Sequence, residues 1–360
     1  MAAPAVVFEE VVSLSELKSL AGAAGPCITI AIPLPDPLEI RIRLKNAVHG
    51  LEKRFPPGDP RRDIAGLLDP IRAAAAAIET KGVWAKALMV LRSPDVFHGY
   101  WLRGVQRETV DAGDQFHLRP LFGAMAREQR FHLLALSQGH VRLFSSTMFR
   151  AEEIELPGTV PRNLHDWLNA RQPDHVMDNR SAGGPSVGSM KGVLFGTNTD
   201  REKHDEYVRL FFKEIDRAVH AALREAAAPL MLAGVQEELA IYRRVNSYPH
   251  VCEQNVNASP DGVPLPDMLE RARDLVCRLP SEPLRKALAD LERRPPLLDA
   301  QEILDRAREG RVGELLIRED AEDDRFDQAA MEVLRHGGRV FAVNPAEAPG
   351  NAAVAAVLRY

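Results

Sequence analysis

The chain has 360 residues, of which 45% are apolar and 27% charged, and its formal net charge is -5. This composition is typical of a globular protein that buries several cores, and the length predicts two or three domains. The acidic balance excludes a uniformly basic surface for binding nucleic acid, so any contact with RNA must come from local basic patches.

Cysteine usage and the N-terminal segment indicate the compartment. The three cysteines, Cys27, Cys252 and Cys277, are far apart and form no C-x-x-C pair, which argues against a disulfide framework or a zinc site. The first residues lack a basic start, and Glu9 and Glu10 follow soon after, so this segment does not read as a signal peptide. No stretch approaches the ~18 apolar residues of a membrane span. We therefore expect a cytoplasmic protein.

The first part of the chain alternates helix and strand patterns. The β-branched run CITIAIPL at 27–34 predicts a strand. Two more strands are predicted at 87–93 and 97–104, because Ser93-Pro94-Asp95 between them is a turn signal. Apolar spacing or alanine content predicts helices at 12–21, 38–55 and 61–80. Together these elements predict an N-terminal α/β domain over residues 1–118.

The second part, residues 119–265, predicts a mixed sheet with a packed helix. RFHLLALS and HVRLF, separated by Gln138-Gly139, predict a β-hairpin. Residues 201–224 have apolar positions at the helical period of 3.6, which predicts one buried face. Further strands are predicted at 151–156 and 228–235.

The third part, residues 266–360, predicts a compact α/β/α unit. Helices are expected at 282–293, 299–308 and 324–336, and strands at 313–319 and 339–344. The fold class expected for the whole chain is therefore α/β, or α+β, with three domains.

A glycine-rich stretch, RSAGGPSVGSMKGVLFG, occupies residues 180–196. Gly183 and Gly188 have the spacing of a phosphate-binding P-loop, but Ser189-Met190 follow where that loop needs Lys-Ser or Lys-Thr. Gly183-Gly184 are adjacent rather than alternate, which excludes a dinucleotide G-x-G-x-x-G motif. The histidines are scattered and form no H-E-x-x-H motif. The sequence therefore predicts no cofactor and no metal site.

Four segments in a fixed order carry a resemblance to a known family. They are RPLFGAMAREQRFHLLALSQGHVRLF (119–144), Gly183-Gly184, KHDEYVRLFFKEI (203–215) and RVFAVNPAEAPGNAAVAAVLRY (339–360). In this order the chain resembles the archaeo-eukaryotic class 1 translation release factors and Pelota, and most closely their bacterial relatives. The resemblance implies a decoding-domain-like N-terminal domain, an RNase H-like middle domain and a C-terminal domain like the kink-turn-binding ribosomal proteins.

Two departures from the family pattern change the expected function. Pro185 stands where the family's catalytic Gly-Gly-Gln loop has its glutamine, and PPGDPRR (56–62) replaces the Asn-Ile-Lys-Ser loop that reads stop codons. The resemblance then implies a ribosome-associated translation factor that acts in rescue, hibernation or stress control. We expect neither stop-codon reading nor peptidyl-tRNA hydrolysis. A ribosome, with its rRNA or a tRNA, is the expected partner, and a translational GTPase could bind the C-terminal domain.

Basic side chains near the two replaced loops are the candidate RNA contacts. A dense basic region surrounds the decoding-loop equivalent, and further cations and glycines lie in and after the glycine-rich stretch. The candidates are Arg41, Arg43, Lys45, Arg61, Arg62, Arg180, Gly183, Gly184, Lys191 and Lys203. Lys53 and Arg54 belong to the same basic region. Many charges on 201–224 also fit plain i,i+4 pairing on a solvated face.

Two other functions stay open from the sequence. A metal-dependent RNA hydrolase would need clustered carboxylates on the RNase H-like sheet. Its candidates are Glu152, Glu153, Glu155, Asp174, Asp178 and Glu237, and no pair among them has the required position, so we assign no catalytic residue. The second alternative is a protein-interaction adaptor for a translational GTPase.

Overall fold

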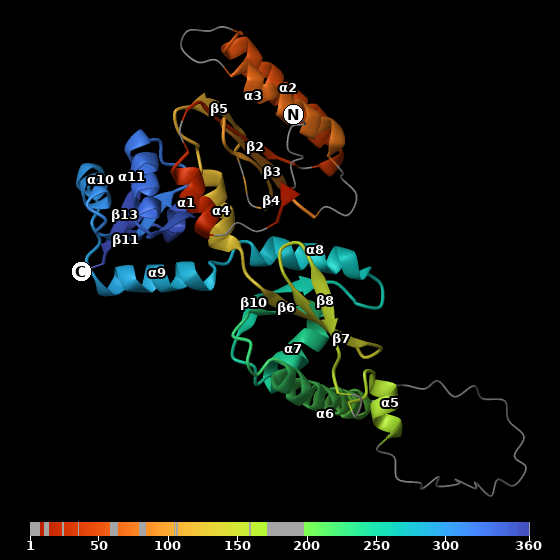
Figure 1. The fold of residues 1–360 in the computed structure, drawn as a ribbon. Helices are drawn as coiled ribbons and strands as arrows, with labels where there is room; N and C mark the ends of the chain where they lie inside the picture. The colour runs from red at the N-terminus through yellow and green to blue at the C-terminus, as the bar shows by residue number, and fades with distance from the viewer. Residues whose placement is uncertain are drawn as a thin grey trace, which may run out of the picture. The chain divides into compact units, whose positions relative to one another are not determined.

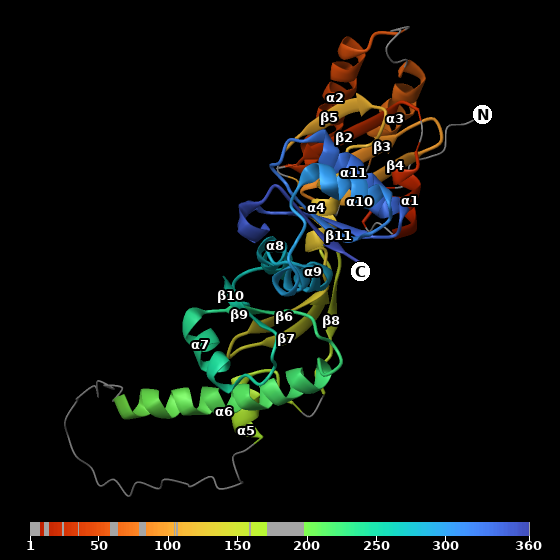
Figure 2. The same cartoon turned by 90° about the vertical axis from the view of Figure 1, so that its left-hand side faces the viewer.

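The computed structural model describes residues 8–10, 14–23, 25–34, 36–57, 64–78, 84–103, 105, 107–157, 160–170 and 198–359. It is a mixed α/β structure of several domains, as the sequence predicts, with three sheets in its described residues (Figures 1 and 2). Contacts group the chain into two units, residues 1–129 with 277–360, and residues 130–276. The three domains bounded at 118 and 265 stay a prediction. No helix in the described residues is long and apolar enough to cross a membrane.

The first sheet of the larger unit has the apolar strand β3 at its centre. Its strand order is β1-β4-β3-β2-β5, and only the β1–β4 pair is parallel. The strands are β1 (Phe8–Glu9), β2 (Cys27–Pro33), β3 (Ala87–Arg92), β4 (Phe97–Leu102) and β5 (Thr109–Gly113). Strands β2, β3 and β4 form where the sequence predicts them, and β1 and β5 add an edge on either side.

Helices α2 (Ile40–Arg54) and α3 (Ala65–Ala77) pack side by side and cover this sheet (Figure 1). The buried positions of α2, among them Leu44, Val48 and Leu51, repeat at the helical period, which turns one face toward the sheet. The 3-10 turn η1 (Pro37–Glu39) leads into α2. Helices α1 (Leu14–Ala21) and α4 (Arg119–Arg127) complete this part of the unit.

The second sheet of the same unit comes from the end of the chain. Its order is β12-β11-β13, with β12 parallel and β13 antiparallel to β11. Strands are β11 (Val312–Arg318), β12 (Arg339–Val343) and β13 (Val354–Leu358), and helices are α9 (Glu282–Arg293), α10 (Ala300–Arg308) and α11 (Asp324–Arg335). Asp299 and Asp323 start α10 and α11 by accepting hydrogen bonds from backbone N–H groups of the first turn.

One hydrophobic core joins the two sheets of this unit. Leu17 of α1, Tyr100 of β4, Phe122 of α4 and Met331 of α11 all belong to the same buried cluster. Since burial of apolar area is the dominant favourable contribution to folding, the first 129 residues and the last 84 residues stabilise one another.

A polar network lies beside this core. His117 places Nε2 3.0 Å from Asp111 and Nδ1 3.6 Å from Asp327, and Arg119 donates from Nε to Asp327 at 2.9 Å. Arg119 also donates to the backbone carbonyl of Ala321. The hydrogen bond to Asp327 raises the pKa of His117, with Asp111 adding to this effect and burial opposing it. Burial alone would raise the pKa of Asp327, but His117 and Arg119 hold it below its usual range.

The smaller unit has the RNase H-like sheet that the resemblance implies. Its order is β10-β9-β6-β7-β8, in which β6, β7 and β8 form an antiparallel meander and β9 and β10 extend it in parallel. The strands are β6 (Phe131–Leu136), β7 (Val141–Ser146), β8 (Ala151–Ile154), β9 (Leu230–Gly234) and β10 (Val251–Asn257). The helices are α5 (Leu164–Asn169), α6 (Asn198–Ala222), α7 (Gln236–Val245) and α8 (Leu265–Val276).

Helix α6 supplies most of the apolar face that covers this sheet. Phe211, Phe212, Ile215 and Val219 are fully buried, at the helical period that the sequence predicts. The ring of Phe212 meets that of Tyr242 edge to face, with centroids 6.0 Å apart. These aromatic contacts fix α6 and α7 against each other.

We expect Phe212→Ala to lower the free energy of unfolding of this unit by about 3–5 kcal/mol, because the change leaves a cavity in a closed core. Tyr207→Ala, on the same helix but 47% exposed, is the matched control and should change it by less than about 0.5 kcal/mol. Urea unfolding followed by circular dichroism measures both. Equal effects of the two changes would contradict the packing of α6.

The His117 network should make the stability of the larger unit depend on pH. Because the folded-state pKa of His117 is raised, its ion pair with Asp327 stabilises the fold fully below about pH 6.5, and this contribution is lost as the pH rises through the folded-state pKa. We expect the stability difference between wild type and His117→Gln to be largest below about pH 6.5 and to shrink as the pH rises through the folded-state pKa. Chemical unfolding at several pH values measures it, and a constant difference would refute the ion pair.

Candidate functional site

Helix α2 presents an exposed stripe that combines apolar and basic side chains. Leu38 of η1 and Ile42 of α2 are 75% and 64% exposed. Lys45, His49 and Lys53 are exposed and continue the same line at spacings of three or four residues. We call these five residues the α2 stripe. Large apolar side chains left in solvent beside cations are typical of a surface that meets a partner.

The two predicted arginine contacts on α2 have partners within the chain. Arg41 donates from Nε and Nη2 to the carbonyl oxygen of Ile78, at 3.2 and 2.8 Å. Arg43 donates to the carbonyl oxygen of Pro33 and pairs with Glu39 at 3.3 Å. Arg41 therefore ties α2 to the residue that follows α3, and Arg43 ties it to the end of β2. Of the three α2 candidates, Lys45 is the one whose side chain the structure places in the α2 stripe.

Sequence reasoning missed the apolar part of this stripe. Leu38 and Ile42 carry no charge, so a pattern of basic residues does not single them out. A signal was present, since both lie outside the positions that the helical period assigns to the buried face, such as Ile40 and Leu44. Apolar residues on the polar face of an amphipathic helix indicate a contact surface.

Most of the other predicted RNA contacts lie outside the described residues. These are Arg61, Arg62, Arg180, Gly183, Gly184 and Lys191. Lys203 belongs to α6, but its side chain is also outside the described part.

The next residues of α6 are described and show how its first half is arranged. His204 lies with Nε2 3.0 Å from the side-chain oxygen of Gln138, in the turn between β6 and β7. Tyr207 is 47% exposed, whereas Val208 is buried in the core. The K-H-x-x-Y-V pattern therefore turns its valine inward and its tyrosine outward.

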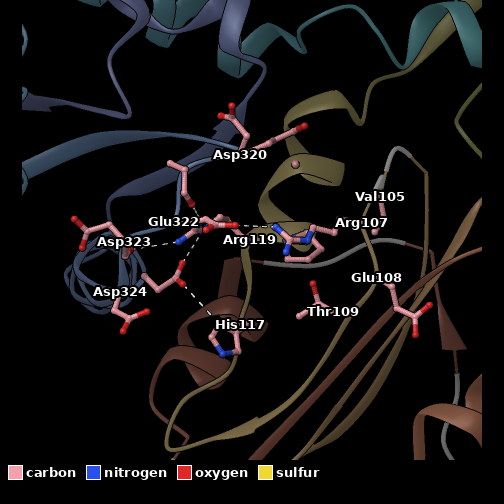
Figure 3. A pocket seen from close by; sticks show the side chains of 15 residues that line it. Val105, Arg107, Glu108, Thr109, His117, Arg119, Asp320, Glu322, Asp323 and Asp324 are labelled. Carbon is pink, nitrogen blue, oxygen red and sulfur yellow. Dashed lines mark hydrogen bonds and ion pairs between the residues drawn. The ribbon is translucent and has the colours of Figure 1, made fainter. Parts of the chain in front are cut away.

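The larger unit also contains an acidic cavity of about 500 Å³ (Figure 3). Seven carboxylates and two arginines line it, together with His117. The carboxylates are those of Glu108, Glu319, Asp320, Glu322, Asp323, Asp324 and Asp327. Arg107 pairs with Glu322 at 3.0 Å, and Arg119 is held by Asp327. This charge repels phosphate, so the cavity is unsuited to RNA.

Burial also shifts the pKa of one carboxyl that lines the cavity. It raises the pKa of the Glu319 carboxyl, which faces the cavity beside Gly123. Burial thus favours the neutral form of Glu319, but the other six carboxylates outnumber the two arginines, so the cavity favours a cation or a basic side chain over an anion.

The hydrolase alternative finds no assembled site in the described part of the smaller unit. Glu153 pairs with Arg142 at 2.6 Å, and Glu152, Glu155 and Glu237 are exposed. Asp174 and Asp178 lie outside the described residues. Among the described residues of this unit, no three carboxylate, histidine or cysteine side chains lie close enough to share a metal ion.

The turn between β6 and β7 also lacks the geometry of a nucleophile and its base. Ser137 Oγ donates to Asp261 at 3.0 Å and accepts from the backbone N–H of His140 at 2.8 Å. The His140 ring contacts Asp261 rather than the serine, at 3.3 Å. A catalytic serine needs the imidazole as its own hydrogen-bond partner, so this cluster holds the turn together instead.

Comparison with solved structures finds similar proteins at low identity. Pelota of Archaeoglobus fulgidus matches with 12% identity and a TM-score of 0.39, covering 98% of this chain and 94% of that chain. The archaeal translation termination factor aRF1 matches with 13% identity and a TM-score of 0.24, covering 97% and 99%. S. cerevisiae Dom34, described as interacting with Hbs1, matches with 10% identity and a TM-score of 0.30, covering 71% and 74%.

No curated protein matches the chain. A family model does, over residues 130–311, which include the whole RNase H-like sheet, helices α5–α10 and the glycine-rich stretch. This match confirms the resemblance to bacterial relatives of the release factors. Because the match covers more than half of the chain, the chain belongs to bacterial archaeo-eukaryotic release factor family 3.

Proposed function

We propose that this protein is a ribosome-associated translation factor of the release-factor type, acting in rescue, hibernation or stress control. Its membership of a release-factor family supports this proposal. The observation that carries it is the α2 stripe. This stripe lies on the helix that leads directly to the equivalent of the stop-codon loop, where a release-factor-like protein would meet the decoding site.

The chemistry of the α2 stripe fits ribosomal RNA. Lys45 and Lys53 can neutralise phosphates, and the release of counterions makes such contacts favourable at low salt. Leu38 and Ile42 can cover the apolar face of an exposed base or ribose, which is common in RNA recognition outside regular duplexes. Arg41 and Arg43, which tie α2 to Ile78 and to Pro33, keep the stripe in a fixed orientation.

The proposed factor neither reads stop codons nor hydrolyses peptidyl-tRNA. Pro185 has no side-chain amide to position water, and it lacks a backbone N–H to donate. The sequence PPGDPRR at 56–62 has no counterpart of the stop-codon reading residues. The candidate contacts Arg61, Arg62, Arg180, Gly183, Gly184, Lys191 and Lys203 remain part of this proposal.

A translational GTPase is the second proposed partner. The resemblance implies that the C-terminal domain, residues 266–360, would bind it. This adaptor role is compatible with binding to the ribosome, since the two contacts use different parts of the chain.

We expect the tagged protein to sediment with ribosomes in sucrose gradients of cell lysates at low salt. Lys45→Glu/Lys53→Glu should weaken this association by at least about tenfold at ~0.1 M salt, because each reversal replaces an attraction to phosphate with a repulsion. Lys286→Glu/Arg293→Glu is the matched control, since it changes the net charge by the same amount and both residues are exposed on α9, where Lys286 pairs with Glu282 at 2.7 Å and Arg293 with Asp290 at 3.9 Å. It should leave sedimentation unchanged.

Two results of the gradient experiment would refute the proposal. One is free protein at the top of the gradient in growing and in starved cells at every salt concentration. The other is an equal loss for the α2 and the α9 variants, which would show that net charge rather than the α2 stripe decides binding. Circular dichroism of each variant shows whether the fold is retained.

We expect no peptide release when purified protein is added to ribosomes that carry peptidyl-tRNA, with or without a stop codon in the A site. The physical reason is the missing glutamine at position 185. A genuine bacterial release factor, added to the same ribosomes, is the positive control. Release above background by this protein would contradict the proposed loss of hydrolysis.

A further inference from the structure

The edge of the first sheet brings together three side chains with metal-binding chemistry. Strand β1 pairs in parallel with β4 in a register that places Phe8 opposite Gly99 and Glu9 opposite Tyr100. Side chains alternate between the two faces of a strand, so Glu9, Tyr100 and His98 share one face of the sheet. Helix α1, which carries Glu16, packs its Leu17 into the same buried cluster as Tyr100.

Close packing holds β1 in this register. A Cβ atom on Gly99 would lie 2.3 Å from the ring of Phe8, so only glycine lets the ring approach β4 here. The Phe8 ring also contacts Trp101, with centroids 5.4 Å apart. The position of Glu9, the next residue, is therefore fixed by its neighbour.

One ligand atom each from Glu9, Glu16 and His98 lies within 4.8 Å of the others, and all three residues are half-buried. Donor atoms bound to one Zn²⁺ at about 2.1 Å are up to about 4 Å apart, so a small adjustment brings these three around a single ion. Two carboxylates so close together repel each other unless a cation or a shared proton lies between them. The cluster is the one group of this kind in the described residues.

Tyr100 is a second and independent sign of a site. Its side chain is 0% exposed, and its hydroxyl is buried with no hydrogen-bond partner among the described residues. The ring stacks on His98 with centroids 5.9 Å apart. Buried hydroxyls are almost always satisfied, so an unpaired one on the face that carries the three ligands indicates a missing acceptor. A metal-bound water or a ligating carboxylate would supply it.

We propose that Glu9, Glu16 and His98 bind one divalent transition-metal ion of the Zn²⁺ or Mn²⁺ class, with Tyr100 as a positioning residue that hydrogen-bonds to a ligand or to metal-bound water. The imidazole selects these ions over Ca²⁺ and Mg²⁺, which prefer oxygen ligands. Three protein ligands leave at least one position for water. The ion would tie the two-residue strand β1 and helix α1 to strand β4, as a clamp on the edge of the sheet.

The test uses the full chain, dialysed against a chelator and titrated with Mn²⁺, Zn²⁺ and Co²⁺ by calorimetry at about pH 7.5, where a histidine is mostly neutral. We expect one equivalent to bind and to raise the melting temperature. Glu9→Gln, Glu16→Gln and His98→Gln should each abolish the tight site and the thermal shift, and Tyr100→Phe should weaken binding by about tenfold or more. His165→Gln, which changes an exposed histidine on α5, is the matched control and should bind as wild type does.

Further outcomes distinguish this metal site from a cysteine site and from a proton shared between two carboxylates. Gly99→Ala changes no ligand but displaces β1, so it should also weaken binding. Intense thiolate charge-transfer absorption of bound Co²⁺ would assign the ion to a cysteine and overturn the proposal. Absence of binding would overturn it too. In that case, a proton shared between Glu9 and Glu16 would explain why the two carboxyl groups lie so close together. Circular dichroism before metal is added confirms that each variant is folded.

Discussion

The larger unit depends on one buried core that neither end of the chain completes alone. The N-terminal sheet and helices α1 and α4 turn apolar side chains toward α10, α11 and the C-terminal sheet, and all of these enter a single cluster. The His117, Arg119 and Asp327 network lies beside that core. Its hydrogen bonds and ion pairs depend on direction, whereas the hydrophobic effect that stabilises the core does not. The acidic cavity and the Glu9, Glu16 and His98 cluster at the β1 edge both lie in the unit that this core holds together.

Local sequence patterns predicted the elements whose own residues contain a turn signal or a regular apolar spacing. The hairpin of β6 and β7 forms around Gln138-Gly139, and α9 spans Glu282–Arg293 as expected from its apolar spacing. Strand β10 was missed because its sequence, VCEQNVN, is mostly polar, and its parallel pairing with β9 decides its conformation. Helix α7 was missed because it begins at Gln236, almost directly after β9, and its N-cap residue Val235 has no side-chain oxygen to cap it.

The sites show the same division between local and long-range information. The pattern of basic residues alone predicts Lys45 as a contact. Leu38 and Ile42 become part of the same surface only once the structure shows that their side chains are exposed. The three ligands of the proposed clamp stand at positions 9, 16 and 98, a spacing that matches no motif. Only the parallel register of β1 on β4 brings the first and last of them together. The sequence-based expectation of no metal site followed from that spacing.

The insertion of residues 130–276 within the larger unit has a consequence for how the chain is made. The smaller unit is continuous, so its sheet and helices can assemble while synthesis continues. The N-terminal sheet leaves the ribosome first, yet the partner strands and helices of its core are encoded after residue 277. The apolar face of this sheet therefore stays exposed until the C-terminal strands and helices have been made, which takes well over half of the translation time. Chaperone dependence during synthesis is the expected cost of a core that is closed by the last residues made.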